Sequence, residues 1–144
     1  GTFSANPLSL VAGMAVLKVL KDRPSIYQSL KNSGEQIASQ INKFCTAEGI
    51  PAHIIGCCSM FRLIFTDKPI ANRRERDERE LAASIQEDFY VTLREQGLLI
   101  GTNRINFLSA MHSKEDLRSI ASIYESALYQ KLKCELRLRN SSSA

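Results

Sequence analysis

No segment of the 144-residue chain is apolar over the roughly 18 consecutive residues that a membrane-spanning helix requires. Its first residues also lack the basic-then-apolar order of a secretory signal peptide. We therefore expect a protein that does not bind membranes, and the cytoplasm or a similar reducing space is the simplest compartment. With 44% hydrophobic and 24% charged residues, the chain has the composition of one compact domain, or of part of a larger protein.

Charge of one sign is only slightly in excess, at a formal net charge of +4, and aromatic residues make up only 7% of the chain. The densest charged run, residues 73–80, carries four positive and four negative side chains. Such a mixed run is typical of a solvated helix start with i,i+4 ion pairs. Aromatic residues are not interleaved with basic ones as base-stacking platforms would be, so we expect no nucleic-acid partner.

Cysteine and histidine are scarce, and their spacing does not favour a metal site. The chain has four cysteines and two histidines: Cys45, Cys57, Cys58, Cys134, His53 and His112. The adjacent pair Cys57–Cys58 is wrongly spaced for tetrahedral zinc, whose paired ligands normally lie two to four residues apart. We expect reduced, buried thiols that behave as small apolar side chains, and no metal. A catalytic Cys–His pair would require a proximity that the spacing does not establish.

Two helices are predicted in the first third of the chain. Asn6 can cap a helix over residues 7–21, and Pro7 suits its first turn because its missing N–H would have no partner there. This helix is apolar on several sides, which indicates broad burial or an interface. Ser25 can cap a second helix that runs to about Glu48 and ends at Gly49.

The rest of the chain alternates predicted strands and helices. Apolar alternation predicts a hairpin over His53–Thr66. A third helix over 76–96, with Gly97 as its stop, is followed by short strands at Leu98–Ile100 and Ile105–Ala110 and by a helix whose capping box is Ser113–Asp116. The pattern predicts an α+β fold, with a small, mostly antiparallel sheet and helices packed on one face. We expect the domain over residues 1–132 and a frayed tail over 133–144.

The residues before the first helix can bind an anion. Thr2 and Ser4 add hydroxyl donors ahead of a helix N-terminus, which offers unpaired N–H groups and partial positive charge. A phosphate group is bound favourably at such a helix N-terminus. An ordinary capped helix after a loop has the same residues, so this pattern alone leaves both interpretations open.

Three segments together resemble one enzyme family. Residues 1–8, Gly-Thr-Phe-Ser-Ala-Asn-Pro-Leu, resemble the Gly-Thr-x-x-Gly-Asn-Pro-Leu segment that opens the C-terminal small domain of class-III pyridoxal-phosphate aminotransferases. Residues 56–61 are similar to that family's Gly-Ser-Met-Phe strand, with Cys57 as a departure. Residues 107–117 are similar to Phe-Leu-Ser-x-x-His-Thr-x-Glu-Asp-Ile. The glutamate-1-semialdehyde 2,1-aminomutase branch is the most similar one, and the resemblance covers residues 1 to about 132.

The resemblance implies a fold-type I small domain that works in a homodimer with pyridoxal 5'-phosphate. Gly1 and Thr2 match the family's pair that reaches the cofactor phosphate of the neighbouring subunit. The lysine that holds the cofactor aldehyde and the acidic partner of its pyridine nitrogen lie upstream of the Gly1 position in the family. We therefore expect no catalytic residue in this chain, a missing large domain as its partner, and no transamination by the chain alone. Lysines on the predicted helices, Lys18, Lys21, Lys31 and Lys43, are expected at the surface.

Substrate contacts are less defined by the sequence. The aminomutase branch has an acidic residue shortly before the Phe-Leu-Ser motif, where this chain has Arg104 in a shortened loop. An arginine there can hold the carboxylate of a small amino-acid or amino-aldehyde substrate, or it can be a surface turn residue. We expect His112 to be a hydrogen-bonded structural residue. The alternative function is a free-standing α+β interaction or regulatory module derived from such a domain.

Overall fold

A computed structural model describes residues 6–101 and 104–133. Its first element, helix α1 (Pro7–Asp22), begins as predicted, because the Asn6 side chain accepts a hydrogen bond of 2.9 Å from the Leu8 N–H. Helix α2 (Ser25–Glu48) ends at Gly49, whose φ of +65° is the left-handed conformation that glycine adopts freely. The predicted Ser25 cap is wrong: Pro24 occupies the cap position without a side-chain hydrogen bond, and Ser25 is already helical.

The sheet has three antiparallel strands in the order β1 (His53–Cys57), β2 (Met60–Ile64) and β3 (Asn106–Phe107). This confirms the predicted α+β class and the hairpin. The strand predicted at Ile105–Ala110 is shorter than expected, and the strand at Leu98–Ile100 does not form. The Leu98 N–H instead closes the preceding helix, donating to the Leu93 carbonyl at 3.0 Å.

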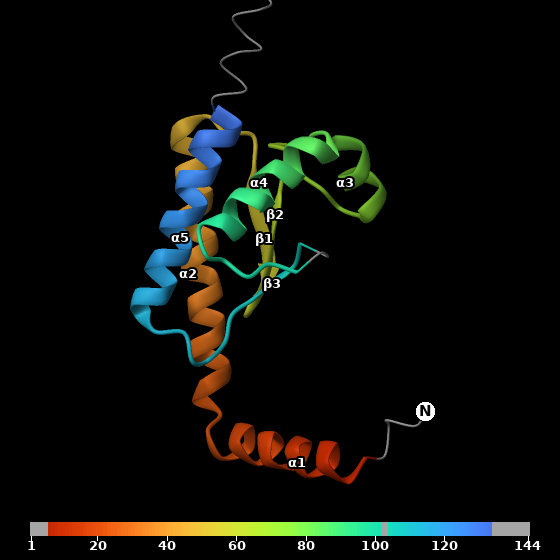
Figure 1. The fold of residues 1–144 in the computed structure, drawn as a ribbon, viewed down its shortest axis with the longest axis vertical. Helices are drawn as coiled ribbons and strands as arrows, with labels where there is room; N and C mark the ends of the chain where they lie inside the picture. Colours follow the sequence, from red (N-terminus) through yellow and green to blue (C-terminus); the bar gives the residue numbers. More distant parts are fainter. Residues whose placement is uncertain (1–5, 102–103, 134–144) are drawn as a thin grey trace, which may run out of the picture.

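The helices α2, α4 (Ala83–Glu95) and α5 (Lys114–Leu128) lie together beside this sheet (Figure 1). The strand side chains Ile54, Phe61 and Leu63 are buried, whereas Ile55 and Met60 on the alternate positions are about half exposed. The face of the sheet that carries Ile54, Phe61 and Leu63 therefore packs against the helices.

The third predicted helix, over residues 76–96, is two helices with a corner. Helix α3 (Arg73–Arg79) ends where Glu80 turns inward, and α4 starts at Ala83. The Glu80 carboxylate accepts from the Phe65 N–H at 3.3 Å and pairs with Arg62 at 3.5 Å. The Leu81 N–H donates to the Phe65 carbonyl at 3.1 Å instead of continuing a helix. These contacts with β2 and Phe65 break the helix. The periodic spacing of apolar residues does not predict them.

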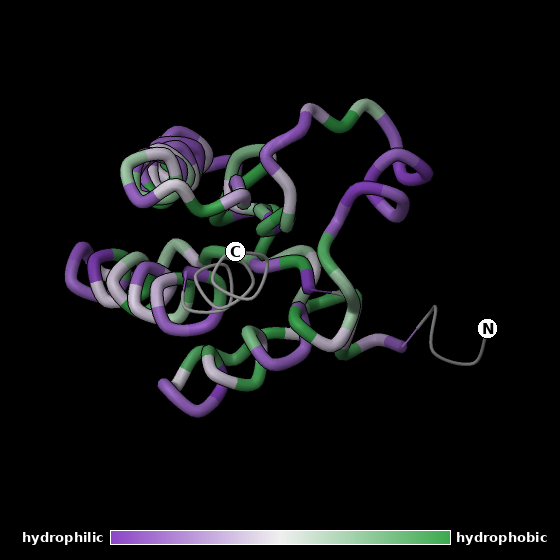
Figure 2. Tube along the Cα trace, turned by 90° about the horizontal axis from the view of Figure 1, so that it is seen from above, coloured by the Kyte–Doolittle hydropathy of each residue, from purple (hydrophilic) through white to green (hydrophobic). Residues whose placement is uncertain are grey.

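Helix α3 is the charged run of the sequence, and it is solvated as predicted. Its i,i+4 ion pairs join Arg73 to Asp77, Arg74 to Glu78 and Arg79 to Glu75. Figure 2 shows this segment as a hydrophilic stretch at one side of the molecule.

The core is built around four aromatic rings. Phe89 meets the rings of Phe65, Tyr90 and Tyr124 at centroid distances of 5.4, 5.4 and 5.9 Å, edge to face in each case. All four side chains are almost fully buried. Because they come from the residue directly after β2, from α4 and from α5, this cluster joins the sheet to two of the helices.

Helix α5 begins with the predicted capping box, in which Ser113 and Asp116 exchange side-chain and backbone hydrogen bonds. A π-helical turn, Tyr129–Lys133, extends it and buries Leu132. Lys133, which the sequence analysis assigned to the tail, lies in this turn and bonds to Glu48 of α2. Residues 134–144, the rest of the predicted tail, lie outside the described residues.

Helix α1 extends away from the rest of the structure (Figure 1). It has no buried residue, although most of its side chains are apolar. Within the described part of the chain, no helix is long and apolar enough to cross a membrane.

Candidate functional site

The predicted cofactor contacts, Gly1 and Thr2, lie outside the described residues. The described residues begin at Asn6, four positions after Thr2, at the N-terminus of α1. There Asn6 satisfies the Leu8 N–H, Pro7 lacks an N–H, and the first turn carries no acidic side chain. An approaching phosphate would therefore meet the positive end of a helix without a repelling carboxylate in that turn.

Helix α1 exposes more large apolar side chains than any other described element. The exposed fractions are 79% for Leu8, 70% for Met14 and 68% for Leu17. The other large apolar side chains that α1 exposes are Leu10, Val11, Val16 and Val19. Contiguous apolar surface of this kind marks an interface in a folded protein. This agrees with the expectation that the first helix is buried broadly or lies at an interface.

Arg104, the predicted substrate contact, interacts with side chains of α4. Its guanidinium bonds to the Gln86 side chain, lies 3.5 Å from a Glu87 carboxylate oxygen and stands 5.4 Å from the centre of the Tyr90 ring. Its own backbone is left-handed, with a φ of +60°. The pKa of Glu87 is lowered chiefly by its bond to Arg94 and also by Arg104. The loop arginine is thus fixed in place and positioned by the domain itself.

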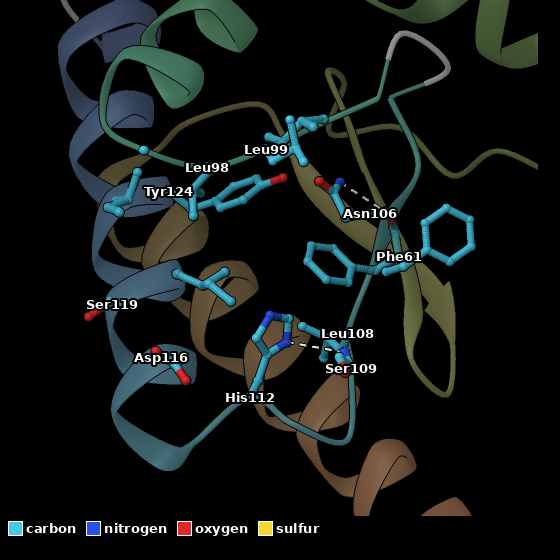
Figure 3. Close-up of a pocket in the computed structure, with 15 residues that line it drawn as sticks. Phe61, Leu98, Leu99, Asn106, Leu108, Ser109, His112, Asp116, Ser119 and Tyr124 are labelled. Carbon is cyan, nitrogen blue, oxygen red and sulfur yellow. Dashed lines mark hydrogen bonds between the residues drawn. The ribbon is translucent and has the colours of Figure 1, made fainter. Parts of the chain in front are cut away.

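A cavity of about 620 Å³ lies between α5, the start of β2, β3 and residues 97–100 (Figure 3). Leu98, Leu99 and Leu108 line it together with Tyr124, whose hydroxyl is directed across it toward Asn106 (Figure 3). Burial raises the pKa of Tyr124 above its usual value. This mostly apolar cavity was not predicted, because it depends on the packing of segments that are distant in sequence.

Both histidines have structural partners. The Nδ1 atom of His53 lies 2.7 Å from the Thr66 carbonyl oxygen, a distance at which the ring N–H donates to it. The Nδ1 atom of His112 accepts from the Ser109 N–H at 3.1 Å (Figure 3). The hydrogen bond predicted for His112 is confirmed.

The cysteines differ from the expectation of buried thiols. Cys45 is buried, and burial raises the pKa of its thiol to about 11. Cys57 and Cys58 are exposed, so the prediction of burial is wrong for this pair, which lies where strand β1 ends and the hairpin turn begins. Within residues 6–101 and 104–133, no group of three or more His, Cys, Asp or Glu side chains is arranged to hold a metal ion.

The predicted surface lysines are confirmed. Lys18, Lys21, Lys31 and Lys43 are all exposed on α1 or α2. Lys18 pairs with Asp22 at 3.0 Å, and Lys31 pairs with Glu35 at 3.7 Å, both as i,i+4 neighbours. None of the four is desolvated as a reactive lysine would be.

Curated relatives of the chain are aminomutases. It is 35% identical over 130 residues to a glutamate-1-semialdehyde 2,1-aminomutase of Methanoregula boonei, a match that covers 89% of this chain and 30% of that protein. The enzyme of the same name from Methanobrevibacter smithii is 32% identical over 130 residues, with the same coverage. The chain therefore spans about 30% of the length of these relatives. No protein-family model matches it.

Solved structures show the same fold within transaminases. An omega-transaminase from Sphaerobacter thermophilus superposes with a TM-score of 0.77 at 24% identity, covering 91% of this chain and 29% of the other. A transaminase with PLP bound superposes with a TM-score of 0.74 at 25% identity, covering 92% of this chain and 29% of the other. In both cases one small part of a much longer chain matches.

Proposed function

We infer that this chain, which belongs to the class-III aminotransferases as a counterpart of their C-terminal small domain, acts as one part of a larger transaminase or aminomutase. The chain spans about 30% of its curated relatives, and none of its helix lysines is placed in a desolvated pocket. In this proposal a large domain supplies the catalytic lysine, and the present chain supplies an interface and part of the cofactor pocket.

The uncovered apolar surface of α1 carries this proposal. A helix with no buried residue and several leucines more than half exposed is not stabilised by packing on its own domain. It becomes favourable when another surface covers it, at roughly 25 cal/mol per Å² of apolar area buried. We propose that the large domain and the second subunit of a homodimer cover the apolar side chains of α1.

Pyridoxal 5'-phosphate, when bound to such an enzyme, supplies the electron sink that allows the amino group to be transferred. The residues of this chain fit its phosphate group, because α1 presents a helix N-terminus without acidic side chains in its first turn. We propose that Thr2 donates its hydroxyl and backbone N–H to that phosphate across the dimer interface. Gly1 allows the backbone to approach closely. The proposed substrate is a small amino acid or amino aldehyde.

Replacement of Thr2 tests this assignment. In the complete dimeric protein, Thr2→Val removes one hydrogen bond to a charged group, which costs about 1.5–3 kcal/mol. The dissociation constant of pyridoxal phosphate should then rise roughly ten- to a hundredfold. The control is Thr46→Val, which removes an exposed threonine hydroxyl from α2 and should leave cofactor affinity unchanged. An unchanged affinity of the Thr2→Val protein would refute the phosphate role.

Arg104 is proposed to face the substrate carboxylate from the loop that α4 positions. In the complete enzyme, Arg104→Gln should raise KM for a carboxylate-bearing substrate about tenfold or more and leave KM for a decarboxylated analogue unchanged. Equal changes for both substrates would assign Arg104 to the structure alone, through its contacts with Gln86, Glu87 and Tyr90.

The reading frame upstream of Gly1 distinguishes the proposal from a free-standing interaction module. A continuous large domain with a cofactor lysine supports the enzyme, whereas a start codon next to Gly1 supports the module. A protein-level test uses the 144-residue chain with pyridoxal phosphate and borohydride. We expect scattered, unsaturable labelling of its lysines, and stoichiometric labelling of a single lysine would contradict the proposal.

A further inference from the structure

The hairpin between β1 and β2 carries two adjacent cysteines that have no part in the proposed cofactor site. Cys57 pairs with Met60 in the last rung of the ladder, so Cys58 and Ser59 form the turn. Cys58 has a φ of +52°, the left-handed region. Hairpin turns favour glycine where φ is positive, because it has no Cβ. The backbone geometry therefore gives no reason for a cysteine at this position.

The two thiols are close together and accessible. Their sulfur atoms are 3.8 Å apart, in hydrogen-bond contact, and neither is in a disulfide. Both residues are exposed, in contrast to Cys45, which is 2% exposed. One atom arriving from solvent can therefore reach both sulfurs.

The distance between the two sulfurs is suitable for both to bind the same atom. For bonds to sulfur of about 2.3 Å, two sulfurs 3.8 Å apart subtend an angle of about 110° at the bound atom. A structural zinc ion would need four ligands. The described residues offer no group of three or more metal-ligating side chains, so these residues do not complete a zinc site around the pair. The geometry fits a soft atom that binds three groups, namely the two sulfurs and one substituent that it already carries.

We propose that Cys57 and Cys58 form a dithiol site that binds trivalent organoarsenicals of the type R–As=O. Two arsenic–sulfur bonds form, the arsenic–oxygen bond breaks, and the oxygen leaves as water with the two thiol protons. Arsenic stays trivalent and no sulfur is oxidised, so no further reactant is required.

The protonation of Cys58 suits this condensation. The hydrogen bond between the two thiols raises the pKa of Cys58, and a negative charge on Cys57 raises it further. Lys31 and Glu35 of α2 act on Cys58 in opposite directions. Cys58 therefore keeps its thiol proton near neutral pH, and this proton leaves with the water.

Phenylarsine oxide is the probe. The purified, reduced protein is titrated with it, and intact mass and peptide mapping are recorded. We expect one phenylarsenic group per chain, bridging Cys57 and Cys58, with two hydrogens lost. An excess of a monothiol should leave the adduct in place, whereas a dithiol such as dimercaptopropanol should remove it, because only the dithiol competes as a chelate.

Single replacements separate chelation from ordinary thiol reactivity. Cys57→Ser and Cys58→Gly should each weaken binding about a hundredfold or more, since the second attachment is lost. Glycine is unstrained at the Cys58 position, so that variant should keep its fold and thermal transition. Cys134→Ser is the matched control and should bind like the parent. Parental affinity in either turn variant, displacement by the monothiol, or an adduct on Cys45 or Cys134 would overturn the proposal.

Discussion

Leu17 and Leu93 offer a matched pair for testing whether α1 is an interface. Leu17 on α1 is 68% exposed, and Leu93 on α4 is fully buried. In the 144-residue chain, Leu17→Ala should change the free energy of unfolding by less than about 0.5 kcal/mol. Leu93→Ala leaves a core cavity and should cost about 3 kcal/mol, which lowers the urea midpoint by roughly 1.5 M.

The effect of Leu17→Ala should be larger in the complete protein. If the large domain and second subunit cover α1, Leu17→Ala removes about three buried carbon groups and costs about 2 kcal/mol of assembly. That is roughly thirtyfold in the association constant, measurable by sedimentation equilibrium. The reasoning would be refuted if Leu17→Ala destabilised the short chain as much as Leu93→Ala does, or if assembly of the complete protein were unaffected.

Two further predictions concern the domain itself. A Cβ at Gly34 would lie 1.7 Å from the Cys58 carbonyl oxygen, so Gly34→Ala should lower the free energy of unfolding by roughly 1–3 kcal/mol. Gly13→Ala, in open space, should cause no loss by the same urea titration, and equal effects would refute the packing argument. The pKa of Asp116 is lowered by its bonds to Ser113, so its stabilisation is present above pH 3.8 and fades as pH falls through the lower folded-state pKa. Asp116→Asn should therefore reduce the melting temperature at pH 7 but not at the lowest pH, and a pH-independent difference would contradict this.

Local signals predicted most of the elements. Asn6, Gly49 and the Ser113–Asp116 box mark helix ends by chemistry confined to a few residues, and these three helix ends were predicted correctly. The corner at Glu80 was missed because its cause lies in β2 and its end, more than a dozen residues earlier. A periodic pattern of apolar residues continues across such a corner, and only the partners of the buried carboxylate reveal it.

The candidate site was predictable only in part. The motif that contains Gly1 and Thr2 could be identified by resemblance, and the Asn6 cap that follows it is confirmed. The contacts of Arg104 with Gln86 and Glu87 join residues about eighteen positions apart through a left-handed turn. No spacing rule predicts such a contact, because it depends on how the loop returns over α4.

The pairing of α2 with α5 has a consequence for the folding of the chain. Gln40 bonds to Glu125 and Glu48 bonds to Lys133, in each case across 85 positions of sequence. Such contacts close a long loop and raise the contact order, which slows folding. During synthesis, α2 and the hairpin emerge well before the helix that completes their core. The nascent domain therefore exposes apolar strand and helix surface until its last segment leaves the ribosome, a period in which it is open to aggregation or chaperone binding.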